Sequence, residues 1–210
     1  MTEIFAFGDS ITWGAFDSEG GWIQRLRKCI ENKNGRDVDF VYNLGIPGNK
    51  TPDILNRFEF ETAQRSNPTE KDKIIIFGVG GNDASYSTIK KDNKINKTDF
   101  EANLIKIIEK AKKITNNLLF VGLIQHNEKK SCPIPWSKTS FYYNKYQKEY
   151  NEIIKTICLK YKIGFLDVIN EFEDPVKNDL LDSDGLHPND KGHKIIFEKL
   201  TAYLTKNKLI

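Results

Sequence analysis

A chain of 210 residues has the length of one domain, and its 39% hydrophobic residues, which include 13 Phe and 8 Tyr, suffice for one core. The 32 basic and 29 acidic residues are spread along the chain and leave a net charge of +3, and no basic block is interleaved with aromatic residues, which argues against a nucleic-acid partner. No apolar run approaches the roughly 18 residues of a membrane span and no signal-peptide profile begins the chain, so the sequence predicts a cytoplasmic protein without membrane insertion.

Five apolar runs alternate with patterns of helical spacing along the chain. The runs predicted as strands are 4–7, 38–44, 73–77, 118–124 and 163–168. The predicted helices are 18–34, 98–114, 139–161 and 189–204, together with a helix that starts at residue 51 and is ended by Asn67-Pro68. No helical pattern precedes residue 18. Strands that alternate with helices indicate the α/β class with a parallel sheet, and the absence of repeats and linkers indicates a single domain over residues 1–210.

Local signals predict where several of these elements begin and end. Thr51 is expected to cap the second helix with its hydroxyl, and Pro52 to stand at the first helical position. Residues 98–101 read as a capping box, and Asn34-Gly35 as the end of the first helix. The polar segment 125–138 is predicted to be a long loop beside the ligand-binding edge of the sheet.

Polar residues stand where the predicted strands end. Ser10 follows the first strand, Gly45 the second and Asn82 the third, while Asp184 and His187 come after the fifth. Because the carboxyl ends of parallel strands meet at one edge of a sheet, where such folds bind their ligands, we expect these groups to converge.

Serine, histidine and aspartate are the side chains of nucleophilic acyl transfer, in which a base removes the proton of the alcohol and a carboxylate fixes the base. Asp184 and His187 are three residues apart across a Gly-Leu turn, which can place the carboxylate on Nδ1 and leave Nε2 for Ser10. Asp182 competes for that role over a looser span. The backbone N–H groups of Ser10 and Gly45 and the side-chain amide of Asn82 are expected to stabilise the oxyanion.

Four blocks of the sequence resemble those of the GDSL/SGNH hydrolases, in the family's order and over nearly the whole chain. They are Gly8-Asp9-Ser10-Ile11, Asn43-Leu44-Gly45, Gly80-Gly81-Asn82-Asp83 and Asp184-Gly185-Leu186-His187-Pro188-Asn189. Ile11 replaces the usual leucine of the first block. The resemblance implies a three-layer α/β/α sandwich with a five-stranded, flavodoxin-like parallel sheet. It also implies a serine esterase or lipase that works through an acyl-enzyme without metal or organic cofactor.

Residue by residue, the resemblance implies Ser10 as the nucleophile, His187 as the base and Asp184 as its partner. It places Gly45 and Asn82 in the oxyanion hole. Ser10 lacks the second glycine of a Gly-x-Ser-x-Gly elbow, so the α/β-hydrolase fold is not indicated.

Several side chains beside these blocks are candidates for contacts with the substrate. Trp13 and Trp136 are candidate walls of the acyl or alcohol pocket, and His126 follows the fourth strand at the same edge. Asp9 is a further candidate, although its favoured role, like that of Asp83, is to hold a loop by accepting hydrogen bonds from backbone N–H groups.

Other residues are expected outside the site. His193 is predicted to lie at a helix start or on the surface. Cys29, Cys132 and Cys158 have neither metal-binding nor redox spacing and are predicted to be reduced thiols, so no metal site is predicted.

Two rival functions remain open at this point. A metal-dependent phosphohydrolase could use Asp9, Asp83 and Asp184 to hold Mg²⁺, and Ser10→Ala would then matter little. A binding protein for an ester or carbohydrate would keep the crevice without chemistry, and the intact set of Ser10, His187 and Asp184 argues against it.

The predicted partner is a small-molecule carboxylic ester. Short-chain acyl esters or acetylated sugars are favoured because segment 125–138 contains no long apolar lid, while thioesters and lysophospholipids stay on the list of candidates.

Overall fold

The computed structural model describes residues 2–34, 40–67, 69 and 72–210, and at its centre lies a parallel sheet of five strands. These strands are β1 (Thr2–Gly8), β2 (Phe40–Gly45), β3 (Asp72–Gly78), β6 (Asn117–Val121) and β8 (Gly164–Leu166). Their order is β2-β1-β3-β6-β8 and every pairing is parallel. Counted along the chain this is the order 2-1-3-4-5 of a flavodoxin-like sheet, so the predicted fold class is confirmed.

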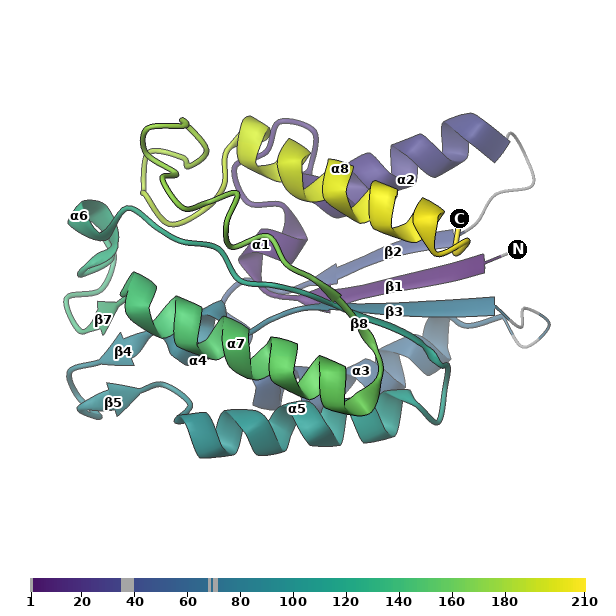
Figure 1. Ribbon diagram of the computed structural model, residues 1–210, viewed down its shortest axis with the longest axis horizontal. Helices are drawn as coiled ribbons and strands as arrows, with labels where there is room; N and C mark the ends of the chain where they lie inside the picture. The colour runs from purple at the N-terminus through teal and green to yellow at the C-terminus, as the bar shows by residue number, and fades with distance from the viewer. Residues whose placement is uncertain (1, 35–39, 68, 70–71) are drawn as a thin grey trace.

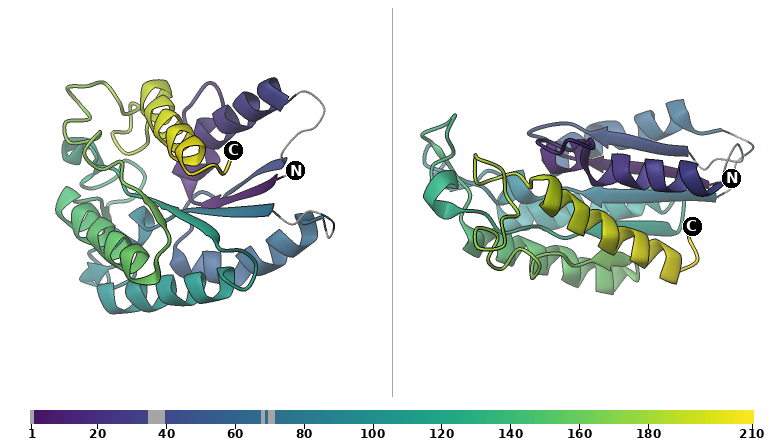
Figure 2. Two further views of the ribbon diagram at one scale, coloured as in Figure 1. Left: turned by 45° about the vertical axis from the view of Figure 1, so that its right-hand side comes forward. Right: turned by 90° about the horizontal axis from the view of Figure 1, so that it is seen from above.

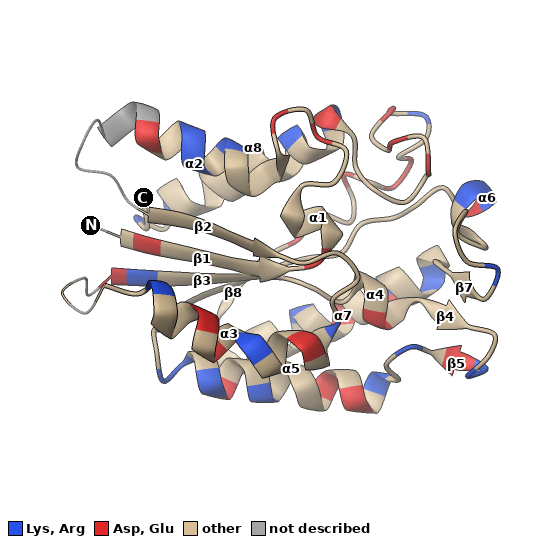
Figure 3. Ribbon diagram, turned by 180° about the vertical axis from the view of Figure 1, so that it is seen from behind, with Lys and Arg blue, Asp and Glu red and all other residues tan. Residues whose placement is uncertain are grey.

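Helices cover both faces of the sheet and make the three layers (Figures 1 and 2). On one face lie α2 (Gly21–Asn34) and α8 (Asp190–Lys206), and on the other α3 (Thr51–Arg65), α5 (Lys97–Ala111) and α7 (Asn144–Tyr161). The charged residues lie mostly on the helices and loops, while the strands carry few (Figure 3). None of the helices in the described part of the chain has the length and apolarity to cross a bilayer.

Two hydrophobic cores fill the space between the sheet and its helices. Successive residues of β1 point to opposite faces, so Ile4 and Ala6 enter the core under α2 and α8, while Phe5 and Phe7 enter the core on the other side. All four side chains are fully buried. This two-sided burial is why the run 4–7 is apolar at every position and not at alternate ones.

A second, smaller sheet lies beyond the carboxyl ends of the main strands (Figure 1). It consists of β4 (Tyr86–Ser87), β5 (Asp92–Asn93) and β7 (Ser140–Phe141), all antiparallel, and α6 (Glu128–Ser131) lies beside it. The prediction that 125–138 is a plain loop was therefore wrong, because α6 interrupts it. The helix predicted from 139 begins only at Asn144, since residues 140 and 141 pair with β4.

The predicted N-cap residue was also wrong for two helices. Lys50, not Thr51, is the N-cap of α3, and its N–H donates to the Asp53 carboxylate at 2.8 Å. The Thr51 hydroxyl donates instead to Asp83 Oδ1 at 2.6 Å, which ties α3 to the loop after β3.

The capping box predicted at 98–101 does not form the start of α5. Asn96 caps this helix and accepts the N–H of Asp99 at 2.9 Å. The other boundaries agree with the prediction to within three residues. Residues 35, 38 and 39 of the predicted helix end and second strand lie outside the described part of the chain.

Candidate active site

Ser10, His187 and Asp184 form a continuous hydrogen-bonded chain at the carboxyl edge of the sheet. Ser10 Oγ lies 2.8 Å from His187 Nε2, although 177 positions separate the two residues. His187 Nδ1 lies 2.6 Å from Asp184 Oδ2. The three side chains thus have the geometry expected for a nucleophile, its base and the group that orients the base.

The turn that carries Asp184 and His187 holds the carboxylate in place. Asp184 Oδ1 accepts the N–H groups of Leu186 and His187 at 2.8 and 3.0 Å. Burial raises the pKa of Asp184, but the hydrogen bonds from His187 and the backbone outweigh it, so this pKa lies below its ordinary value. Asp182 is not the partner of His187, and its carboxylate accepts the Ser183 hydroxyl instead.

Ser10 opens a short helix, α1 (Ser10–Trp13), that the sequence analysis did not predict. Asp9 caps it by accepting the N–H of Ile11 at 3.0 Å. The turn into α1 depends on Gly8, because a Cβ there would overlap Thr12 Oγ1 and the Gly78 carbonyl. The N–H of Ser10 precedes the first intrahelical donor, and none of the described residues accepts it.

Asp9 and Asp83 hold the loops of the site, as expected. Asp83 is fully buried and accepts both the N–H and the hydroxyl of Thr51. Burial raises the pKa of Asp9 and of Asp83 to about 6 each.

Both the nitrogen and the oxygen of the Asn82 side-chain amide make hydrogen bonds. Nδ2 donates to the Asn49 carbonyl at 3.0 Å and, over a longer 3.3 Å, to Asp9 Oδ2. Oδ1 accepts the hydroxyl of Tyr142 at 2.5 Å. Tyr142 was missed by the sequence analysis, and nothing in its local pattern marks it, because this contact joins residues 60 positions apart.

The Gly45 N–H, predicted to donate to an oxyanion, is engaged by a neighbouring side chain in the structure. This N–H donates to Asn43 Oδ1 at 3.0 Å, because the Asn43 side chain folds back on its own turn. Gly48, three residues further on, lines the cleft beside Ser10, Asn82 and His187. Its φ is +82°, and its N–H has no acceptor within the described segments.

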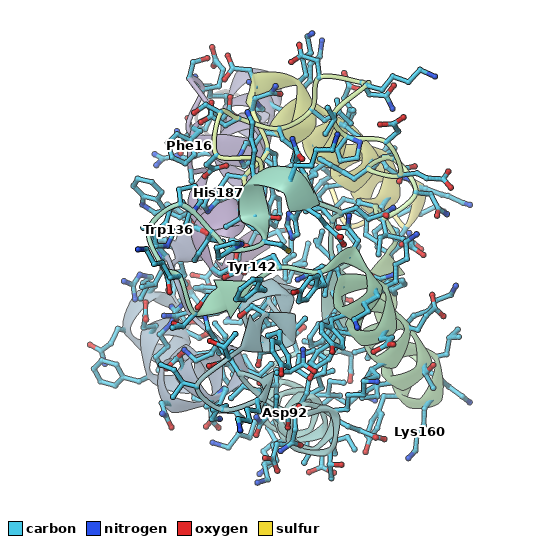
Figure 4. All side chains as sticks on the ribbon, turned by 90° about the vertical axis from the view of Figure 1, so that its left-hand side faces the viewer. Phe16, Asp92, Trp136, Tyr142, Lys160 and His187 are labelled. Atoms are coloured by element: carbon cyan, nitrogen blue, oxygen red, sulfur yellow. The ribbon has the colours of Figure 1, made fainter. Side chains whose placement is uncertain are left out.

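Two hollows meet at Ser10. The larger is an outer cleft of about 520 Å³ whose exposed walls include Trp13, Phe16 and Trp136. Figure 4 shows Phe16, His187, Trp136 and Tyr142 together at this end of the molecule. The Trp136 and Phe16 rings lie 6.2 and 5.3 Å from the His187 ring. The structure thus places both predicted tryptophans in the wall of the cleft and adds Phe16.

The smaller hollow is an inner cavity of about 50 Å³ behind Ser10 and His187. Asp9 and His126 line it together with apolar residues such as Ile124 and Ile196. His126 Nδ1 lies 2.9 Å from the Leu186 carbonyl, and its Nε2 has no partner in the residues described. Burial lowers the pKa of His126 to about 4, so this ring is neutral at physiological pH.

His193 lies at a helix start, one of the two positions predicted for it, and not on the surface. It is fully buried in the first turn of α8, where Nε2 lies 3.0 Å from the Ala15 carbonyl. It therefore supports the loop after α1 and stays outside the triad.

The three aspartates that a metal site would need are engaged elsewhere. Asp9 accepts a backbone N–H, Asp83 binds Thr51 and Asp184 binds His187. Over the part of the chain that the structure describes, no three His, Cys, Asp or Glu side chains cluster in a way that could hold a metal ion.

The model of the GDSL-like lipase/acylhydrolase family matches residues 6–195. No curated protein matches the sequence.

Among solved structures, a lipase/acylhydrolase from Enterococcus faecalis is similar, with a TM-score of 0.78 at 20% identity over 99% of this chain and 97% of that one. The acetyl xylan esterase AlAXEase gives 0.74 at 22% identity over 96% and 99%. Axe2, an acetylxylan esterase from Geobacillus stearothermophilus, gives 0.70 at 19% identity over 95% and 92%. At such identities the likeness establishes the fold.

Proposed function

Since the chain belongs to the GDSL-like lipase/acylhydrolase family, we propose that it is a serine esterase that hydrolyses a carboxylic ester through an acyl-enzyme at Ser10. The observation that carries this proposal is the chain of hydrogen bonds from Ser10 through His187 to Asp184, which opens onto the outer cleft.

In the first half of the reaction, His187 Nε2 takes the proton of Ser10 as Oγ attacks the ester carbonyl. Asp184 holds the ring with Nδ1 protonated and stabilises the imidazolium that forms. His187 then gives the proton to the leaving alcohol, and the acyl group stays on Ser10. In the second half, His187 activates a water that releases the acid.

The oxyanion is stabilised by three donors in this proposal: the N–H of Ser10, the N–H of Gly48 and the Asn82 amide. Gly48 replaces Gly45 because it lines the cleft, whereas the Gly45 N–H is taken by Asn43. The bond from Asn82 to Asp9 is long, at 3.3 Å, so an oxyanion can compete for that proton.

The two hollows suggest how an ester is divided between them. The inner cavity of about 50 Å³ has room for about two water molecules, which matches a short acyl group and not a long chain. The outer cleft is tenfold larger and has aromatic walls, which suit a sugar as the alcohol portion. The likeness to two acetylxylan esterases supports a short acyl ester of a sugar as the substrate.

The test of this function is the intact mass after incubation with a fluorophosphonate. Wild type is expected to gain one adduct, mapped to Ser10, because only an activated serine reacts. Ser10→Ala and His187→Ala are expected to gain none, whereas Ser66→Ala, a change at the C-cap of α3, should react like wild type. Folded wild type without an adduct would refute the triad.

Removal of the Asn82 amide tests the oxyanion hole. Asn82→Ala is expected to lower kcat by roughly 10²- to 10³-fold, because one donor to the developing charge is lost. Steady-state kinetics with a short-chain aryl ester measure it, and a loss of tenfold or less would take Asn82 out of this role.

Tyr142 is proposed to orient that amide. Tyr142→Phe removes the hydroxyl on Asn82 Oδ1 and is expected to lower kcat by about tenfold with little change in KM, less than the loss of the amide itself. Tyr143→Phe, on the next residue, is the matched control and should behave like wild type. Equal kinetics for both variants would remove Tyr142 from the site.

A further inference from the structure

Two lysines line the outer cleft, and no Asp or Glu is among its described lining residues. Lys50 stands at the start of α3, and Lys94 follows β5. The other lining residues include no further Lys and no Arg. The wall that faces a bound ester is therefore positively charged.

Lys94 is a partly buried cation with no counter-ion among the described residues. Its Nζ lies 5.8 Å from the centre of the Tyr142 ring, and the Tyr142 hydroxyl holds Asn82. Within the described segments no carboxylate lies within the 4.0 Å of an ion pair from this Nζ. Burial and the nearby charge of Lys50 both lower the pKa of Lys94. A partly desolvated charge without a partner is unfavourable until a ligand brings the opposite charge.

The acidic residues near the cleft act on Lys50 and not on Lys94. Lys50 Nζ lies 3.3 Å from Asp53 Oδ2, but both side chains are partly exposed, so this pair is weak. Asp83 is fully buried and accepts hydrogen bonds from Thr51, and the charge of Lys50 acts to lower its pKa against the larger effect of burial. Asp9 lines the inner cavity. Lys94 thus leaves positive charge on the side of the cleft where Asn82 and Tyr142 lie.

We propose that the alcohol portion of the substrate carries an anionic group, bound by Lys94 with Lys50 beside it, so that the protein cleaves short-chain esters of an acidic alcohol. This rests on the proposed function, because the alcohol portion is the part assigned to the outer cleft. The exposed rings of Trp136 and Phe16 supply the apolar surface against which a sugar ring or a glycerol backbone packs.

A carboxylate of an acidic sugar and a phosphate of a lipid headgroup share this chemistry. Two substrate pairs distinguish these sources. The first compares the acetyl ester of methyl glucuronide with the same ester in which the carboxylate is replaced by a carboxamide. The second compares acetyl glycerol phosphate with acetyl glycerol. In each pair the ester bond is the same. The glucuronide pair differs in charge at nearly constant shape, so its ratio of kcat/KM values reports the charge. The glycerol pair differs by the whole phosphate group, so the part of its ratio that is lost in 0.5 M NaCl reports the charge.

Wild type is expected to favour the anionic member of at least one pair by about tenfold or more at low salt, and the preference should fall in 0.5 M NaCl because screening weakens the ion pair. Lys94→Gln is expected to lower that ratio by about tenfold, with a further loss in Lys50→Gln/Lys94→Gln.

Lys160→Gln is the matched control. Its Nζ lies 5.9 Å from the Tyr161 ring, as Lys94 lies over Tyr142, but Figure 4 shows it far from His187 and the cleft. The control should keep the wild-type ratio. Thermal melting of all variants checks that each is folded.

A preference for one pair assigns that source of the anion, and a preference for both supports the shared chemistry. Ratios near one in an active wild type would overturn this inference and leave the esterase intact. Calorimetric binding of methyl glucuronide, its carboxamide, glycerol phosphate and glycerol to Ser10→Ala is measured alongside. If no ester is cleaved, tighter binding of the anionic compounds that is abolished by Lys94→Gln would still support the anion subsite. Equal binding of the anionic and neutral compounds within each pair would overturn the subsite as well.

Discussion

Ser10→Ala is expected to lower kcat toward a short-chain ester by roughly 10⁴- to 10⁶-fold, because it removes the hydroxyl that His187 activates for the covalent acyl intermediate. The effect should fall on kcat more than on KM, since the cleft walls that bind the ester are unchanged. Single-turnover and steady-state kinetics measure it, with Ser66→Ala as the control.

The same variant separates the esterase from its main rival. A phosphohydrolase that works through a bound metal ion needs no serine nucleophile, so Ser10→Ala would keep most of its activity and a chelator would remove it. Activity of Ser10→Ala within tenfold of wild type would therefore refute the mechanism proposed above.

Asp184→Asn is expected to lower kcat by about 10⁴-fold, because an amide cannot hold His187 in the tautomer that accepts the Ser10 proton. In wild type, the hydrogen bonds that depress the pKa of Asp184 keep it ionised while His187 acts as base. Steady-state kinetics with the same short-chain ester measure the loss.

Asp182→Asn provides a close comparison in the same loop. The Asp182 carboxylate accepts the Ser183 hydroxyl, and its backbone N–H, which donates to the His187 carbonyl at 2.8 Å, is retained in the variant. Its activity should stay within about threefold of wild type. Similar losses in the two variants would mean that the loop conformation, and not the Asp184 carboxylate, supports His187.

The main sheet could be predicted because its strands are buried on both faces. The runs 4–7 and 73–77 are apolar at nearly every position, and β1 and β3 lie at the middle of the sheet. Since the ends of such strands meet at one edge, Ser10 and His187 could be brought together from sequence alone.

The features that were missed depend on contacts that leave no local pattern. β4, β5 and β7 have two residues each and α1 has four, which is too short for any periodicity. Tyr142 reaches Asn82 only through the folding of distant segments. The choice between Gly45 and Gly48 depends on where the Asn43 side chain turns, and that cannot be read from two glycines in one loop.

The turn that carries Ser10 is held by backbone contacts and not by the side chains of the cleft. A Cβ at Gly8 would overlap the Gly78 carbonyl, and a Cβ at Gly45 would overlap the backbone of Trp13, so the main chain packs closely on both sides of this turn. The rings of Trp13, Phe16 and Trp136 remain more than half exposed. Substitutions in the cleft wall can therefore change which substrate is recognised while the position of the Ser10 nucleophile is kept. Libraries confined to these three positions should yield new ester specificities with little loss of folding.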